Sequence, residues 1–238
     1  MATKEIGELE SNAIARVRAE LARPLNAALR ALNLISEVVQ LGAGKKLSKA
    51  TIVRTLLLQR ILGDLRCCTI LAERGYGIQS AVHASSIFEG WVTISAICKE
   101  EDAISWLNHP REDVSFGQIK KLTRIAVETI VDVPEDWNRL AAQHYDHYRQ
   151  LCMAKHLNPI VERRRGYLME GKQIEFVHGP DLSEQGLRHI LFAVHSGAHF
   201  AMFALLAFNC KEGPPLTERM KSEMESILSE LRATQPAE

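Results

Sequence analysis

Residues 49–74 (KATIVRTLLLQRILGDLRCCTILAER) and residues 78–98 (IQSAVHASSIFEGWVTISAIC) decide the fold of this chain. Each segment is too long for an ordinary strand and carries apolar residues at helical spacing. Only Gly75-Tyr76-Gly77 separates them, and so short a glycine turn joins antiparallel neighbouring helices. Ser48 precedes the first segment and is expected to cap its N-terminus. The stretch therefore predicts a helical hairpin in the first half of the chain.

Helical periodicity continues on both sides of this hairpin. Residues 5–41 are expected to form a helix, or a helix pair bent near Pro24. Asp181 and Glu184 have the spacing of a capping box for a helix that ends near Cys210. Residues 166–180 interrupt the pattern and predict a small hairpin or an irregular loop. The remaining expected helices cover residues 102–107, 115–131, 134–157 and 216–231.

These segments predict an all-α bundle of seven or eight helices. We expect a single domain over residues 1–238, with an N-terminal helical arm (5–41), a core bundle (48–210) and a C-terminal helix (216–231). The 238 residues carry 29 Lys and Arg against 29 Asp and Glu. This balance excludes a protein that binds nucleic acid through its global charge.

The cysteines and the most apolar segment bear on the compartment. The five cysteines show no C-x-x-C spacing, which predicts reduced thiols and a cytoplasmic protein. Residues 190–208 (ILFAVHSGAHFAMFALLAF) contain no formally charged residue and are long enough to test as a membrane span. Two histidines and several small residues dilute this segment, and no comparably apolar segment accompanies it. We therefore expect a buried core helix and no membrane partner.

The candidate site lies in residues 144–159 (HYDHYRQLCMAKHLNP). A guanidinium is a fixed fork of donors for phosphate oxygens, and an imidazole can move a proton near neutral pH. Arg149 and His156 are seven residues apart, which is about 700° of helical rotation, so both are expected on one side of the helix. Tyr145 and Cys152 have offsets that place them on the same stripe. The predicted site is completed by Lys155 and Asn158. The structural alternative is that Arg149 pairs with a carboxylate and His156 caps the helix end.

This motif resembles the signature of the HEPN superfamily of helical bundles. In that signature an Arg is followed by a polar residue, here Gln150, and by a His after four to six intervening residues. Many HEPN proteins are metal-independent ribonucleases that act as dimers with a composite site. The resemblance implies that His156 assists attack of a ribose 2′-hydroxyl on the adjacent phosphate. It implies that Arg149 stabilises the developing charge, with RNA as partner, no cofactor, and a setting in stress or phage defence. Other members are inactive nucleotide-binding or toxin–antitoxin modules.

A second resemblance covers about residues 50–160. The helix that ends in LAERGY (71–76), followed by a helix with an S-[IL]-F-E core (86–89), is similar to an uncharacterised bacterial helical family. No established activity comes with that resemblance. Relatives carry an Arg a few residues before the Phe-Glu pair, whereas this chain has His83-Ala84-Ser85-Ser86 there. An Arg-dependent role at that position is therefore not implied.

His195 and His199 form a second candidate site. Their i,i+4 spacing can place two imidazoles on one metal, with Glu89 or His83 as a third ligand. Their structural alternative is a pair of hydrogen-bonded core histidines. Glu89 lies in an apolar context and needs a partner, for which we expect Arg60 or Arg66. The leading prediction is thus a HEPN-like endoribonuclease or RNA-binding homodimer. The alternatives are a non-catalytic helical scaffold and a bundle that binds a metal or small ligand.

Overall fold

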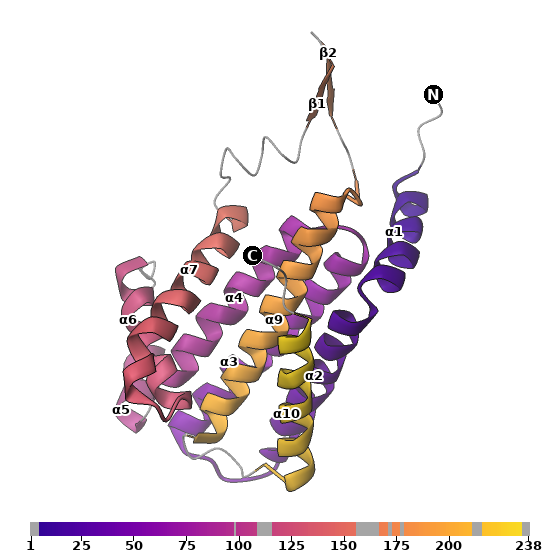
Figure 1. The fold of residues 1–238 in the computed structure, drawn as a ribbon. Coiled ribbons are helices and arrows are strands. Elements are labelled where there is room, and N and C mark those ends of the chain that lie inside the picture. The colour runs from indigo at the N-terminus through magenta and orange to yellow at the C-terminus, as the bar shows by residue number, and fades with distance from the viewer. Residues whose placement is uncertain are drawn as a thin grey trace.

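The computed structural model describes residues 5–97, 99–108, 116–155, 167–170, 173–176, 179–210 and 216–234. This part of the chain is an all-α multi-helix bundle with one small two-stranded hairpin (Figure 1), which confirms the predicted fold class. The elements are α1 (Ile6–Glu20), α2 (Ala22–Leu41), α3 (Lys49–Glu73), α4 (Gly77–Ala96), α5 (Glu100–Leu107), α6 (Phe116–Ile130), the 3-10 turn η1 (Pro134–Asp136), α7 (Trp137–Lys155), β1 (Tyr167–Glu170), β2 (Gln173–Phe176), α9 (Glu184–Cys210) and α10 (Glu218–Ala233).

The predicted hairpin is formed by α3 and α4, which pack side by side. Ser48 caps α3 as expected, because its side chain accepts a hydrogen bond from the Thr51 amide. Gly75 adopts a φ of 86°, in the left-handed region that glycine tolerates best. A Cβ there would also lie 2.6 Å from the Cβ of Pro180. The turn thus needs a glycine for both its backbone conformation and its packing.

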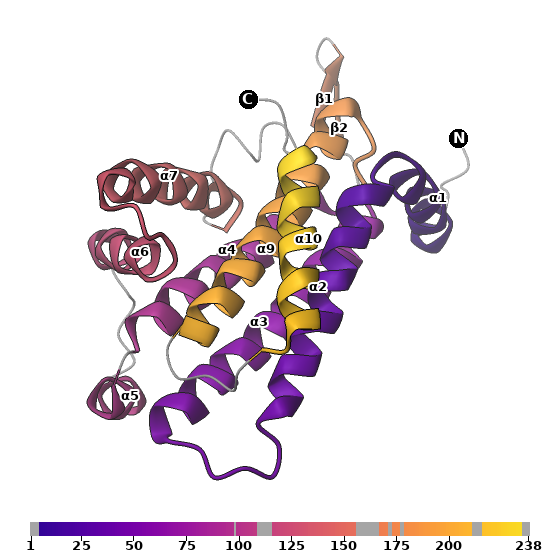
Figure 2. The same cartoon turned by 60° about the horizontal axis from the view of Figure 1, so that its bottom comes forward.

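Helices α4 and α9 lie against each other along the centre of the bundle, and α3 and α2 also pack on α9 (Figure 2). Aromatic rings join the two central helices: Trp91 stacks on Phe200 with ring centroids 5.6 Å apart, and Phe88 meets Phe200 edge-on at 4.9 Å. Residues Glu184–Asn209 form a helix that is long and apolar enough to cross a membrane, and its mean hydropathy is 1.8. However, 72% of this apolar stretch is buried inside the bundle. This placement agrees with the expected core helix.

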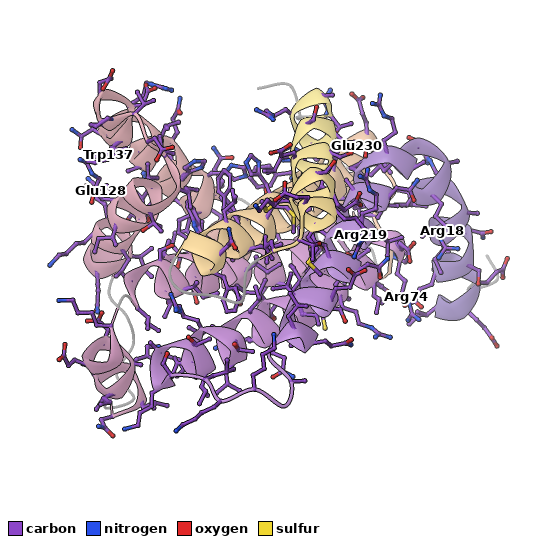
Figure 3. The ribbon with its side chains drawn as sticks, turned by 90° about the horizontal axis from the view of Figure 1, so that it is seen from below. Arg18, Arg74, Glu128, Trp137, Arg219 and Glu230 are labelled. Atoms are coloured by element: carbon purple, nitrogen blue, oxygen red, sulfur yellow. The ribbon has the colours of Figure 1, made fainter. Side chains whose placement is uncertain are left out.

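The predicted N-terminal arm divides at Leu21 into two helices with different environments. Helix α1 lies at the edge of the bundle, whereas α2 buries a face against α3, α9 and α10. Arg30 of α2 donates to Glu223 and Glu230 of α10 at 2.8 and 2.9 Å. Figure 3 shows Glu230 and Arg219 along α10, and Arg219 forms a further ion pair with Glu37 of α2. Helix α2 is therefore part of the core rather than an arm.

Two helix starts differ from the sequence prediction. Pro134 begins the 3-10 turn η1, and α7 starts only at Trp137. The predicted capping box at Asp181 is wrong, because the Ser183 hydroxyl accepts from the Gly186 amide at 3.0 Å. Asp181 instead accepts from the amide and the hydroxyl of Ser183. The hairpin alternative for residues 166–180 is confirmed, with Tyr167 paired to Phe176 in an antiparallel register.

Candidate functional site

Helix α7 carries the predicted site and packs against α4 and α6. Its inner face buries Tyr148, Leu151 and Cys152. Arg149 lies on the outer face, where Oδ1 of Asp146 is 3.5 Å from its Nη1. Both of these side chains are 65% exposed. The guanidinium is therefore open to a ligand that approaches α7 from solvent.

The single stripe expected for Tyr145, Arg149 and Cys152 is wrong. Cys152 is buried and Tyr145 is half-buried, whereas Arg149 is exposed. Three residues correspond to about 300° of rotation, so the direction of Cys152 differs from that of Arg149 by about 60°. That difference is enough to cross from the outer face of α7 to its inner face.

The second half of the predicted pair lies outside the described residues. His156 and Asn158 belong to this part of the chain. Lys155 is the last described residue of α7, and its side chain also lies outside the description. The juxtaposition of Arg149 with His156 therefore stays a prediction.

A partly buried polar contact joins α4 to the same end of α7. The Tyr148 hydroxyl donates to Oε1 of Glu89 at 2.9 Å, and the Tyr148 ring stacks on Phe88 with centroids 4.6 Å apart. Burial is the main reason that the pKa of the Tyr148 phenol is raised, and a hydrogen bond with Cys152 adds to it. The structure thus shows Tyr148 as a partner of Glu89, in a place where Arg60 or Arg66 was expected. This contact holds the turn of α7 that carries Arg149 against the centre of the bundle.

Four histidines gather where α7 faces α9, and we call them the histidine cluster: His144, His147, His195 and His199. The ring centroids of His195 and His199 are 5.6 Å apart, and those of His144 and His199 are 6.4 Å apart. His147 Nε2 lies 2.6 Å from the Ser196 hydroxyl, which itself donates to the Phe192 carbonyl. His147 therefore donates through Nε2 in this arrangement. His195 likewise places Nε2 2.8 Å from the Leu231 carbonyl and donates to it.

Burial holds these imidazoles in their neutral form. It lowers the pKa of His144 and of His147 to about 4. The pKa of His199 falls to about 3, through burial first and then through the neighbouring histidines and Arg232. The pKa of His195 is also lowered by burial, against the opposing effect of its bond to Leu231. The cluster is consequently uncharged near neutral pH.

The predicted metal site at His195 and His199 lacks the expected third ligand. Glu89 is bound to Tyr148, and His83 lies 2.9 Å from Asp64. Across the described residues, no three His, Cys, Asp or Glu side chains are arranged to hold a metal ion. The geometry instead agrees with the structural alternative for His195, which is a hydrogen-bonded core histidine.

Sequence reasoning missed the α7 half of the histidine cluster. His144 and His147 have the i,i+3 spacing that places two side chains on neighbouring positions of a helix. That signal was present in the sequence, but nothing local shows that the pair faces α9. Sequence reasoning also missed the contact between Asp64 of α3 and His83 of α4. Arg60 lies one helical turn from Asp64 and is the more obvious partner in the sequence.

Comparison with known proteins finds no family model that matches this chain, and it finds neither a curated protein nor a solved structure with significant similarity.

Proposed function

We propose that this chain acts on RNA through the C-terminal end of α7, as a HEPN-like metal-independent endoribonuclease or RNA-binding effector. The proposal rests on the Arg149–Gln150–His156 motif and on its resemblance to that superfamily. The structural observation that supports it is the exposure of Arg149. Its side chain is 65% exposed, and the ion pair that it forms within the described residues is long and joins it to a carboxylate that is equally exposed. An ion pair of this kind contributes little to stability and yields readily to a phosphate.

The chemistry follows from the two side chains. Neutral His156 takes the proton of a ribose 2′-hydroxyl as that oxygen attacks the adjacent phosphorus. Arg149 donates to the phosphate oxygens as negative charge develops on them. The 5′-oxygen leaves, and the products are a 2′,3′-cyclic phosphate and a 5′-hydroxyl end. We propose a homodimer as the acting form, with the two α7 ends facing one composite site.

The test is cleavage of mixed RNA by the purified full chain in the presence of a chelator. We expect cyclic-phosphate ends from the wild type and loss of cleavage in both His156→Ala and Arg149→Ala. Arg139→Ala is the matched control, because Arg139 lies on the same helix, is also exposed and forms an i,i+3 pair with Asp136. Cleavage that persists in His156→Ala, or that stops on chelation, contradicts the proposal. Binding without cleavage leaves the RNA-binding effector as the function.

A second candidate is a non-catalytic scaffold that assembles through helix faces. Large apolar side chains are exposed on α3, namely Ile52, Leu56 and Ile70, and further ones are exposed on α5. Surfaces of this kind favour association with another protein surface. A stable oligomer that dissociates in Leu56→Glu, with no RNA cleaved or bound by any form, supports the scaffold instead of the ribonuclease.

A metal or small ligand bound by His195 and His199 stays a prediction. The neutral imidazoles of the histidine cluster favour it, since metals bind the unprotonated ring. The arrangement of the described side chains disfavours a three-ligand site. Stoichiometric zinc or iron in the purified protein, lost in His199→Ala, supports this reading.

A further inference from the structure

Asp64 of α3 and His83 of α4 form a carboxylate–imidazole pair between the two helices of the hairpin. Oδ1 of Asp64 lies 2.9 Å from Nδ1 of His83. The Asp64 side chain is 18% exposed and the His83 side chain is 32% exposed. The imidazole is thus partly open to solvent, while the carboxylate behind it is largely covered.

This contact decides which nitrogen of His83 is available. A carboxylate can only accept a hydrogen bond, so the proton of a neutral His83 ring resides on Nδ1. Nε2 then carries the free lone pair. Within the described residues, no hydrogen bond engages this nitrogen. A carboxylate behind Nδ1 also fixes the orientation of the ring.

The charge beside the pair favours an anionic partner. Nε of Arg60 lies 3.7 Å from Oδ2 of Asp64, beyond hydrogen-bond distance, and its side chain is 68% exposed. Oδ2 is buried and has no hydrogen-bond partner among the described residues. Because this long contact is the one that holds Arg60 among the described residues, its guanidinium can turn toward a dianion placed on the neighbouring imidazole.

We propose that His83 is a phosphoryl-acceptor site, whose Nε2 is phosphorylated by small acyl phosphates or phosphoramidates. The Nε2 lone pair attacks phosphorus, and the bond from phosphorus to the leaving oxygen or nitrogen breaks. The leaving group departs with that electron pair, as a carboxylate from an acyl phosphate or as ammonia from phosphoramidate. The nitrogen of phosphoramidate is already protonated before the reaction, so ammonia leaves without taking a proton from the protein. No proton leaves the ring: Nδ1–H remains bonded to Asp64, whose charge stabilises the cationic phosphoimidazole. Arg60 pairs with the phosphoryl oxygens.

The chemistry of the pair supports this assignment over a purely structural bridge. A bridge between α3 and α4 requires one hydrogen bond, and a neutral side chain could make it. A carboxylate with a buried oxygen that accepts no hydrogen bond lowers the stability of the fold. A cationic ring strengthens the existing bond between Nδ1 and Oδ1, because the charge of the ring then offsets that of the buried carboxylate. The proposal is independent of RNA cleavage at α7.

The experiment incubates the full chain with potassium phosphoramidate, and separately with acetyl phosphate, near neutral pH. We expect one phosphoryl group per chain by intact mass, labile in acid and stable in alkali, and a phosphorus NMR signal of Nε2-phosphohistidine. Peptide mapping is expected to place the group on His83. His83→Gln removes this product, whereas the control His189→Gln retains it.

The role of Asp64 is tested by measuring the rate at which His83 is phosphorylated in variants of the pair. We expect Asp64→Asn to slow phosphorylation by about ten-fold, as the loss of a ring-orienting carboxylate does elsewhere. Arg60→Gln should slow it less and should shorten the lifetime of the product. Circular dichroism reports whether each variant folds, and Asp64→Ser replaces Asp64→Asn if the latter does not. Phosphorylation that is unchanged in His83→Gln, no faster at His83 than for free imidazole, or equally fast in Asp64→Asn overturns the proposal.

Discussion

Acidification should destabilise this protein through the histidine cluster, and His199 is the group on which to measure it. An unfolded histidine has a pKa near 6.5, whereas burial, the neighbouring histidines and Arg232 lower that of folded His199 to about 3. Below about pH 6.5 the unfolded chain therefore binds a proton that the folded chain does not. The stabilisation is complete above that pH, and it is lost progressively as the pH falls toward about 3.

The size of the effect follows from the same two values. At about pH 5 the unfolded ring is charged and the folded ring is neutral, so the difference is 1.5 pH units, or about 2 kcal/mol. His144 and His147, with a pKa of about 4 each, add a similar amount. The three together lower the free energy of unfolding by at most about 6 kcal/mol, which is comparable to the whole stability of a typical domain. The histidines also lower one another's pKa values, so adding the three contributions counts this repulsion more than once. The observed loss of stability is therefore smaller than the sum.

The assay is urea unfolding followed by circular dichroism at about pH 8 and about pH 5, for the wild type and for His199→Gln. The substitution has its own cost, which the measurement at the higher pH gives directly. Between the two pH values, we expect the variant to lose about 2 kcal/mol less than the wild type. An identical loss in both proteins refutes the reasoning, since it places the proton uptake elsewhere.

Three further predictions concern packing and backbone. Tyr148→Phe removes the hydrogen bond to Glu89 and should lower the free energy of unfolding by about 1.5–3 kcal/mol, measured in urea; no loss would show that the contact is not formed in solution. Ser48→Ala removes the cap of α3 and should cost about 1 kcal/mol by thermal denaturation, whereas Ser48→Asp should retain most of the stability. Gly75→Ala should destabilise the fold strongly, because the φ of Gly75 is positive and Pro180 fills the space that a Cβ would need. Gly63→Ala should instead stabilise the fold by about 0.5–1 kcal/mol, because Gly63 lies in the exposed middle of α3 and a Cβ there would meet no other atom. Equal melting temperatures for these two glycine variants would contradict the turn geometry.

The helices themselves could be predicted from the sequence because their causes are local. The spacing of apolar residues in residues 49–74 and 78–98 defines two helices, and Ser48 and Gly75 act within one turn of the backbone that they terminate. The error at Asp181 is also local: two polar residues that are two positions apart compete for one cap, and the backbone geometry selects Ser183. The uncharged segment 190–208 likewise identified the helix that the bundle buries.

The candidate sites depended on how the helices are arranged. Whether Glu89 meets an arginine or Tyr148 depends on which face of α7 packs against α4, and no spacing within either segment contains that information. Helical periodicity places His195 and His199 on one face of α9. Their proximity to His144 and His147 arises only because α7 faces α9 in the folded chain. The same holds for Asp64, whose sequence neighbour Arg60 lies at 3.7 Å while His83, on another helix, is bonded at 2.9 Å. Helix formation depends on residues that are close along the chain, whereas the chemistry of a side chain depends on residues that are close in space. Only the tertiary packing brings the residues of these sites together.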